Sequence, residues 1–265
     1  MSMNIRFDNK VAVVTGGTAG IGLACAQLFG QLGAKVAICG TNPAKLAAAL
    51  EELKAQGITA FGETCDVSDG ESLKGFARHA EEALGGLDIW VSNAGVYPQY
   101  SIIDTPENVW DKTVDTNMKS VYLGARIAYE AMKDKGGVML LASSFAAVFP
   151  SVGSGVYAAT KSAVKSMVNT LAAELAPYGI RVNGYIPGVI DTDMTHALTV
   201  SNGEAMKSAI AMQTFGEAPW MWRGRWRFWH RTMPAISPAP RWRAAAARWA
   251  CRTPPKAWKD KETRA

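Results

Sequence analysis

The sequence predicts an α/β fold, a single domain over residues 1–217 built on a doubly wound parallel sheet. From residue 10 to 188, short apolar runs alternate with longer amphipathic stretches, which is the pattern of repeated βαβ units with helices on both faces of a sheet. A glycine-rich turn directly follows the first apolar run. A length of 265 residues also suits one large domain better than two small ones.

Six apolar runs are clear strands, and the stretches between them have helical periodicity. The predicted strands are residues 11–14, 35–39, 60–65, 87–91, 138–142 and 181–185. The predicted helices are residues 21–32, 43–56, 71–84, 109–133 and 156–176.

Charge divides the chain into two unlike parts. Residues 1–217 carry 16 basic and 21 acidic side chains, whereas residues 218–265 carry 12 basic and 2 acidic ones, so the net charge of +5 comes from the tail. The tail also holds seven of the nine Trp and six of the twelve Pro. We expect this Arg/Trp/Pro-rich segment to be irregular and separate from the domain.

Other features of composition exclude whole classes of protein. No apolar run is long enough to span a membrane, and the N-terminal residues lack the apolar core of a signal peptide, so the expected protein is soluble and cytoplasmic. The four cysteines show neither metal-ligand spacing nor a disulfide framework. We therefore expect reduced, mostly buried thiols and no metal.

The glycine-rich turn is the first candidate binding site. It reads Thr15-Gly16-Gly17-Thr18-Ala19-Gly20-Ile21-Gly22 and lies between a predicted strand and a predicted helix. Glycines there permit a tight turn and let a pyrophosphate approach the backbone at the helix N-terminus. A dinucleotide is the expected ligand, with contacts at Thr15, Gly16, Thr18, Gly20, Ile21 and Gly22.

Tyr157 and Lys161 lie four residues apart on a predicted helix, so they share one face. A phenol is a poor acid or base at neutral pH unless a fixed cation stabilises its phenolate, and a lysine one turn away can supply that cation. Alone, this spacing is common on solvated helices. Further motifs along the chain give the pair its meaning.

Several motifs occur together in a fixed order: Thr-Gly-x-x-x-Gly-x-Gly from Thr15, Asp66-Val67, Asn93-Ala94-Gly95, Ser144, Tyr157-x-x-x-Lys161 and Pro187-Gly188-Val189-Ile190-Asp191-Thr192. Over residues 8–217 the chain thereby resembles the classical short-chain dehydrogenase/reductases (SDR). The resemblance implies a Rossmann-like domain. It also implies an NAD(P)(H)-dependent oxidoreductase that interconverts a small-molecule ketone or other carbonyl compound and a secondary alcohol.

The same resemblance assigns a catalytic role to four residues. Tyr157 is the expected acid/base, and Lys161 is expected to lower the Tyr157 pKa and to hold the nicotinamide ribose. Ser144, rather than its neighbour Ser143, is expected to bind the substrate oxygen. Asn117 is expected to position a water and Lys161 for proton relay, although a polar residue that kinks a helix is also a sufficient explanation for it.

Expected cofactor contacts follow the ends of the predicted strands, which is where open α/β sheets bind ligands. Beyond the glycine-rich turn they are Thr41, Asn42, Asp66, Val67, Asn93, Ala94, Gly95, Tyr157, Lys161, Pro187, Gly188, Ile190 and Thr192. Gly40 stands where NAD-preferring members of the family place an Asp, which favours NADP(H), with NAD(H) as the alternative. Thr41 and Asn42 could donate to a 2′-phosphate with Lys45 nearby, but Ala19 and Thr41 are not basic as in many NADP-preferring members.

The tail departs from the family, whose members continue with a last helix and a seventh strand. Trp and Met have single codons, and in the displaced reading frame Trp220-Met221 becomes Asp and Met221-Trp222 becomes Val, as the family pattern has there. We therefore hypothesise a frameshift near Ala218, which resequencing of that region of the gene tests. The usual seventh strand is then missing, and a homo-oligomer (dimer or tetramer) expected for the family is weakened.

Other functions remain open at this stage. A 3-oxoacyl-thioester reductase is the alternative within the same enzyme class. A basic-aromatic tail that binds nucleic acid or an anionic surface is an alternative of another class, less favoured because the tail reads as frameshifted. An inactive frameshifted product is a third. The expected substrate pocket is apolar, lined by Val96, Tyr97, Phe145, Phe149, Pro150 and residues 194–212.

Overall fold

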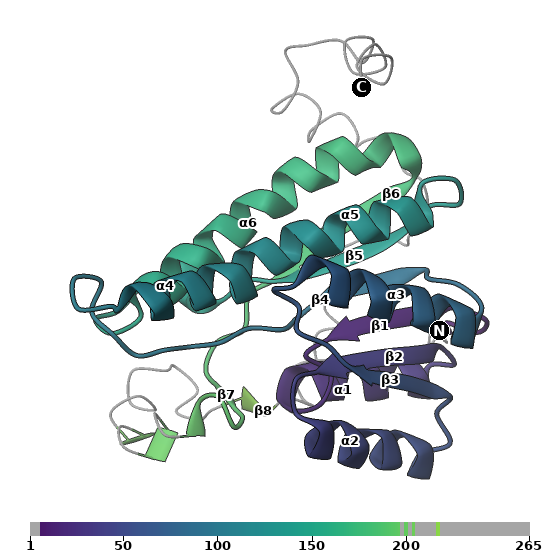
Figure 1. Ribbon diagram of the computed structural model, residues 1–265, viewed down its shortest axis with the longest axis horizontal. Coiled ribbons are helices and arrows are strands. Elements are labelled where there is room, and N and C mark those ends of the chain that lie inside the picture. The colour runs from purple at the N-terminus through teal and green to yellow at the C-terminus, as the bar shows by residue number, and fades with distance from the viewer. Residues whose placement is uncertain (1–5, 197–198, 201–202, 205–215, 218–265) are drawn as a thin grey trace, which may run out of the picture.

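The computed structural model describes residues 6–196, 199–200, 203–204 and 216–217. A parallel six-stranded sheet in the order β3-β2-β1-β4-β5-β6 forms its centre (Figure 1). The strands are β1 (Val11–Thr15), β2 (Lys35–Gly40), β3 (Ala60–Thr64), β4 (Ile89–Ser92), β5 (Gly137–Ala142) and β6 (Ile180–Tyr185). The reversal of strand order beside β1 brings the carboxyl ends of β1 and β4 to a crevice, which is the usual ligand site of this architecture.

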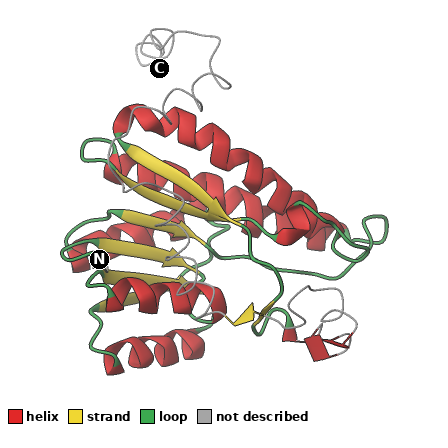
Figure 2. Cartoon of the chain, turned by 180° about the vertical axis from the view of Figure 1, so that it is seen from behind, coloured by secondary structure: helices red, strands yellow, loops and turns green. Residues whose placement is uncertain are grey.

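Helices cover both faces of the sheet, as the doubly wound prediction requires (Figure 2). One apolar core lies under α1 (Gly20–Gln31) and α2 (Pro43–Ala55). The other lies under α3 (Gly70–Leu84), α5 (Ser120–Met132) and α6 (Gly155–Leu175), and it contains the fully buried Trp90 of β4. The expected fold class and all six expected strands are confirmed, with ends that differ by two residues at most.

One predicted helix was wrong in detail. Residues 109–133 were expected to be one helix, but the structure has α4 (Glu107–Val114), a five-residue π-helical segment η1 (Asp115–Lys119) and then α5. Asn117 lies within η1 and is 1% exposed, with its side chain bonded to residues on other elements. Single π-helical turns of this kind often mark functional sites.

The two faces of β5 and β6 differ in how far neighbouring helices bury them. Met139, Leu141 and Ile180 are buried under α5 and α6, whereas Val138 and Leu140, which point to the opposite face, are half-buried. Within the described part of the chain no helix lies over that opposite face (Figure 2). The expectations of an irregular tail, a missing seventh strand and a frameshift concern residues outside those described.

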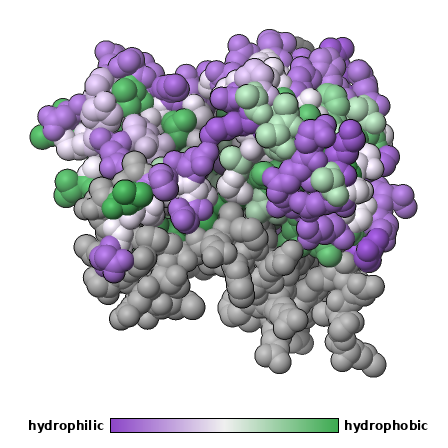
Figure 3. Space-filling view, turned by 90° about the horizontal axis from the view of Figure 1, so that it is seen from below, coloured by the Kyte–Doolittle hydropathy of each residue, from purple (hydrophilic) through white to green (hydrophobic). Residues whose placement is uncertain are grey.

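Short elements complete the fold. The 3-10 turns η2 (Phe145–Ala147) and η3 (Ala176–Tyr178) flank α6 at its two ends. The two-residue strands β7 (Ile190–Asp191) and β8 (Gly216–Glu217) pair in parallel as a small sheet of their own, which the sequence did not predict. Seen from below, the coloured part of the surface carries both hydrophilic and hydrophobic residues (Figure 3).

Candidate active site

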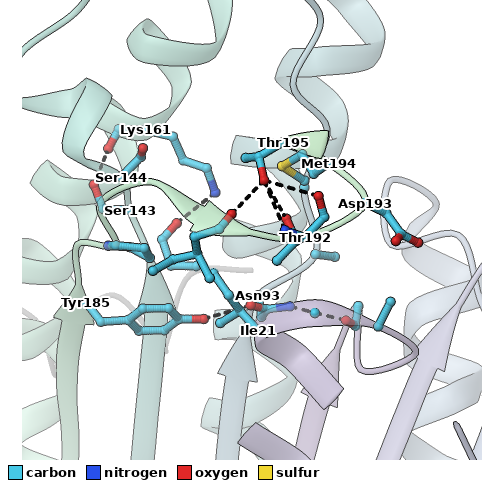
Figure 4. Close-up of a pocket in the computed structure, with 18 of the residues that line it drawn as sticks. Ile21, Asn93, Ser143, Ser144, Lys161, Tyr185, Thr192, Asp193, Met194 and Thr195 are labelled. Carbon is cyan, nitrogen blue, oxygen red and sulfur yellow. Dashed lines mark hydrogen bonds between the residues drawn. The ribbon is translucent and has the colours of Figure 1, made fainter. Parts of the chain in front are cut away.

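A pocket of about 330 Å³ opens at the carboxyl ends of β1, β4, β5 and β6. Figure 4 shows side chains from these strand ends, from α6 and from the segment after β7 converging on it. Its lining residues are Gly16, Ala19, Gly20, Ile21, Lys45, Asn93, Ala94, Gly95, Ala142, Ser143, Ser144, Tyr157, Lys161, Tyr185, Pro187, Gly188, Ile190, Thr192, Asp193, Met194 and Thr195.

The glycine-rich turn forms one wall because its backbone comes unusually close to neighbouring segments. Gly16 has φ 65°, and a Cβ there would lie 2.8 Å from the Cα of Ala94. Gly20 has φ 52°, and a Cβ there would lie 3.0 Å from the Thr192 methyl carbon. Both the positive φ and the lack of space restrict these positions to glycine. The wall therefore presents backbone to the pocket at the N-terminus of α1, which suits a pyrophosphate.

Asn93 fastens this wall to the rest of the sheet. Its Nδ2 donates to the carbonyl oxygens of Thr15 and Gly16, both at 3.2 Å, and its Oδ1 accepts from the Tyr185 hydroxyl at 3.0 Å (Figure 4). The Thr15 hydroxyl oxygen in turn accepts from the backbone N–H groups of Asn93 at 3.0 Å and Ala94 at 3.2 Å. Three strand ends are thus tied together by side-chain hydrogen bonds, so the pocket wall is held in shape before any ligand binds.

The two serines after β5 have different surroundings. Ser143 is buried and donates to the backbone oxygen of Lys161 at 2.9 Å, so it fastens α6 to the end of β5. Ser144 caps η2, where its Oγ accepts from the Ala146 N–H at 3.2 Å, and it lines the pocket close enough to Tyr157 to lower the pKa of that phenol. Ser144 is therefore the serine that meets the phenol in the pocket, whereas Ser143 supports the helix that carries it.

Lys161 is 4% exposed and donates from Nζ to the carbonyl oxygen of Ala142 at 2.8 Å. Burial disfavours its charged form and lowers its pKa from the usual 10.5 to about 8. Asn117 lies close by: a Cβ on Gly95 would lie 3.2 Å from Asn117 Oδ1 and 3.5 Å from Lys161 Nζ. Asn117 itself exchanges hydrogen bonds with the Val96 backbone, accepting from its N–H at 2.8 Å and donating to its carbonyl at 2.9 Å.

The pKa of Tyr157 differs from the expectation. Burial raises it above the usual value, and the Ser144 hydrogen bond opposes that rise without cancelling it, while nearby Tyr97 adds to it. Lys161 Nζ lies 5.8 Å from the centre of the Tyr157 ring and directs its hydrogen bond to Ala142. Burial is therefore the largest of the effects on the Tyr157 pKa.

The structure brings twelve of the expected cofactor contacts to the pocket wall, and the others lie behind or beside it. Two of the twelve, Tyr157 and Lys161, are also expected catalytic residues, and Ser144 brings the number of catalytic residues at the wall to three of the four expected. Thr15, Gly22 and Asn117 lie behind the wall and support it. Thr18 sits beside Gly40, and Asn42 caps α2 by accepting from the Lys45 N–H at 3.0 Å. Asp66 accepts from both the N–H and hydroxyl of Ser68, Val67 is buried, and Thr41 is exposed.

The structure adds pocket residues that were not among the predicted site residues. Tyr185 lies at the carboxyl end of β6, so the rule that ligands bind at strand ends could have found it. Asp193 follows β7, and no local pattern marks it, whereas Met194 and Thr195 belong to the segment 194–212 that was expected to line the substrate pocket. Lys45 and Asp193 also pair with each other across the pocket rim, at 2.6 Å.

The described residues contain no cluster of three or more His, Cys, Asp or Glu side chains able to hold a metal ion. No helix among them has the length and apolar character needed to cross a membrane.

The pocket geometry matches what comparisons with known proteins find. A family model described as short chain dehydrogenase matches residues 10–202. The chain belongs to the short-chain dehydrogenase family. Among curated relatives, human dehydrogenase/reductase SDR family member 4 is 38% identical over 213 residues, 79% of this chain and 77% of its own length.

Other relatives of this short-chain dehydrogenase agree. The 3-oxoacyl-[acyl-carrier-protein] reductase FabG of Staphylococcus epidermidis is 32% identical, covering 79% of this chain and 86% of its own. A short chain dehydrogenase from Burkholderia cenocepacia, solved in complex with NADP, superimposes with a TM-score of 0.78 at 31% identity, covering 88% and 95% of the two chains. Family membership makes the protein an NAD(P)-binding oxidoreductase that acts on CH–OH groups of small molecules.

Proposed function

We propose that this short-chain dehydrogenase interconverts a ketone and a secondary alcohol, with Tyr157 as the acid/base. The observation that carries the proposal is that Ser144, Tyr157 and Lys161 line the same pocket as the glycine-rich turn. The nicotinamide cofactor supplies or accepts the hydride. In reduction, Tyr157 gives its proton to the carbonyl oxygen, and in oxidation it takes the proton of the alcohol.

Three further residues assist the transfer of a proton between Tyr157 and the substrate oxygen. Ser144 can donate to the substrate oxygen because its own Oγ already accepts from the Ala146 N–H, which fixes its orientation. Lys161 carries a buried charge beside the phenol and holds the nicotinamide ribose. Asn117 fixes the loop after Gly95 through its two hydrogen bonds to the Val96 backbone. It also lies close to Lys161, where it can take part in the relay of a proton.

The pocket suits a dinucleotide at both ends. The positive φ of Gly16 and Gly20 leaves backbone, not side chain, against the pocket, so a pyrophosphate can approach the N-terminus of α1. Pro187, Gly188, Ile190 and Thr192 also line the pocket, and we propose that they contact the nicotinamide. Asp66 and Val67 are proposed to lie at the adenine, beyond the pocket described above.

We propose NADP(H) as the preferred cofactor. No carboxylate stands at Gly40 to repel a 2′-phosphate, and a Cβ there would lie 2.8 Å from the Thr18 hydroxyl oxygen, so Thr18 fills the space that an Asp would need. Lys45 supplies a cation at the same rim. NAD(H) is the alternative, and titration of the protein with both reduced cofactors distinguishes them.

For the substrate we propose an apolar ketone. Tyr97 packs on Tyr157 with ring centres 4.5 Å apart, so aromatic surface lies beside the phenol. Phe145, which follows Ser144 in the sequence, packs on the exposed Phe149 at 5.0 Å. The FabG relative acts on 3-oxoacyl groups of an acyl-carrier protein, as its name states. Assays with simple ketones and with 3-oxoacyl thioesters separate the two substrate classes.

Three wider proposals accompany this function. Residues 1–217 form the catalytic domain, and residues 218–265 are a segment foreign to the family. The protein is cytoplasmic and forms a homo-oligomer. Nucleic-acid binding by the tail is the competing proposal, and it predicts steep salt dependence that is lost when residues 218–265 are deleted.

Tyr157→Phe tests the central proposal. The substitution removes the proton donor but keeps the ring that packs on Tyr97, so we expect carbonyl reduction to fall by at least about 10²-fold while NADPH binding, followed by fluorescence, is unchanged. Tyr100→Phe is the matched control because Tyr100 is 40% exposed and lies outside the pocket. Unchanged turnover in Tyr157→Phe would refute the assignment.

A further inference from the structure

An ion pair spans the rim of the pocket between segments far apart in the sequence. Lys45, in the first turn of α2, places its Nζ 2.6 Å from Oδ2 of Asp193, which follows β7. Their side chains are 50% and 72% exposed, and both residues line the pocket. The Lys45 ammonium lowers the pKa of Asp193, so the carboxylate is charged at neutral pH.

Asp193 lies on a turn that is stabilised by hydrogen bonds within the turn itself. The Thr195 hydroxyl donates to the carbonyl oxygens of Ile190, at 2.6 Å, and Thr192, at 3.1 Å, and accepts from the Thr192 N–H at 3.1 Å. Thr192 in turn lies against Gly20, where a Cβ would come within 3.0 Å of its methyl carbon. In Figure 4 the Asp193 carboxylate points away from Thr195 and Lys161. The turn therefore lies across the glycine-rich wall and offers Asp193 to the α2 side.

The α2 side of the rim has little positive charge besides Lys45. Among the described residues that line the pocket, Lys45 and Lys161 are the cationic ones, and Lys161 is buried at the catalytic end. The Asn42 side chain accepts from the Lys45 N–H, and Thr18 occupies the space beside Gly40. A phosphate on the adenosine ribose of the cofactor would therefore meet Lys45 as its cation. In the structure, Lys45 is already paired with the Asp193 carboxylate.

We propose that Lys45 binds the 2′-phosphate of NADP(H) and that Asp193 competes with this phosphate for it. The inference rests on the proposed function, because it presumes that the dinucleotide lies along the glycine-rich wall. An exposed ion pair contributes little stability, so a phosphate dianion can displace the carboxylate. NADP(H) then breaks the link between α2 and the turn of residues 192–195, whereas NAD(H), which lacks the 2′-phosphate, leaves it intact. Asp193 thus weakens binding of the phosphorylated cofactor selectively.

Nucleotide fragments test this without catalysis. Binding of 2′,5′-ADP, which carries the 2′-phosphate, and of 5′-AMP, which does not, is measured by calorimetry on the full chain. We expect Asp193→Asn to tighten 2′,5′-ADP by about two- to fivefold, the range that an exposed ion pair permits, and to leave 5′-AMP unchanged. The gain should shrink as salt is raised from about 0.02 M to 0.5 M.

Two further variants make the test specific. Asp191→Asn, the same chemical change at another exposed carboxylate on the same segment, should leave both affinities unchanged. Lys45→Gln should weaken 2′,5′-ADP, and in the Lys45→Gln background Asp193→Asn should have no effect, since the competition requires the cation.

The outcomes also separate this inference from the proposed function. If Asp193→Asn leaves 2′,5′-ADP affinity unchanged, weakens it, or changes 5′-AMP equally, the competition is refuted even though the wild-type protein binds NADPH. If the wild-type protein binds neither fragment and neither reduced cofactor, the proposed function falls together with the inference.

Discussion

Lys161→Met gives the sharpest stability prediction, because the structure buries an ammonium that the substitution removes. Lys161 is 4% exposed, and burial lowers its pKa from 10.5 to about 8. Each unit of difference between these two pKa values corresponds to about 1.4 kcal/mol. Below pH 7, keeping the Lys161 side chain charged in the folded protein therefore costs about 3 kcal/mol. Methionine has similar length and no charge, so it avoids this cost.

The gain is smaller than the full cost. The variant also loses the 2.8 Å hydrogen bond to the Ala142 oxygen, and an unsatisfied buried carbonyl costs about 1–2 kcal/mol. We therefore expect Lys161→Met to raise the free energy of unfolding by about 1–2 kcal/mol at pH 7 while carbonyl reduction is lost. A gain of stability with loss of activity is typical of a functional residue.

The pH dependence has a definite sign. Between pH 8 and 10.5 the unfolded chain holds a proton on Lys161 that the folded chain has released, so the wild-type protein becomes relatively more stable as pH rises. The difference in unfolding free energy between Lys161→Met and wild type should therefore shrink by about 1 kcal/mol from pH 7 to pH 9, and stay constant below pH 7.

Urea denaturation at pH 6, 7, 8 and 9 measures this difference. Lys165→Met is the matched control, since Lys165 lies one turn further along α6 and is exposed. It should give no pH-dependent difference from wild type over the same range. If the difference in unfolding free energy between Lys161→Met and wild type is equally large at pH 6 and pH 9, the lowered pKa of Lys161 is refuted.

Two other predictions concern the serine pair and the cofactor rim. Ser144→Ala should reduce turnover by about 10²-fold and, because the Ser144 hydrogen bond lowers the Tyr157 pKa, should move the alkaline limb of the pH profile for reduction to higher pH. Ser143→Ala should instead lower stability by about 1 kcal/mol through the lost bond to the Lys161 carbonyl and leave that limb in place; the reverse pattern would exchange their roles. Gly40→Asp combined with Thr18→Ala should lower the affinity for NADPH relative to NADH by about tenfold or more in fluorescence titrations. Gly40→Asp alone should be strained, because a Cβ at this position lies 2.8 Å from the Thr18 hydroxyl oxygen. If the double variant binds NADPH and NADH with equal affinity, the proposed role of Gly40 at the cofactor rim is contradicted.

The parts of the structure that the sequence predicts well are those that local chemistry decides. The six strands follow from apolar runs such as residues 11–14, and the glycine-rich turn follows from the positive φ that Gly16 and Gly20 adopt. The position of that turn between strand and helix also predicts where the pocket opens.

The parts that the sequence does not predict depend on contacts between distant segments. The π-helical turn at Asn117 accompanies bonds to Val96 and Thr160, which are 21 and 43 positions away along the chain. The Lys45–Asp193 pair joins residues 148 positions apart. Neither periodicity nor propensity carries such information, because both describe neighbours along one element.

The raised pKa of Tyr157 and the lowered pKa of Lys161 have the same main cause, which is burial. Burial disfavours the phenolate of Tyr157 and the ammonium of Lys161 alike, so the ammonium becomes the stronger acid of the two. In the mechanism that we propose, transfer of a proton from the side of Lys161 back to the Tyr157 phenolate is therefore downhill. The same apolar surroundings that make Lys161 costly for stability thus favour recovery of the protonated phenol after each reduction.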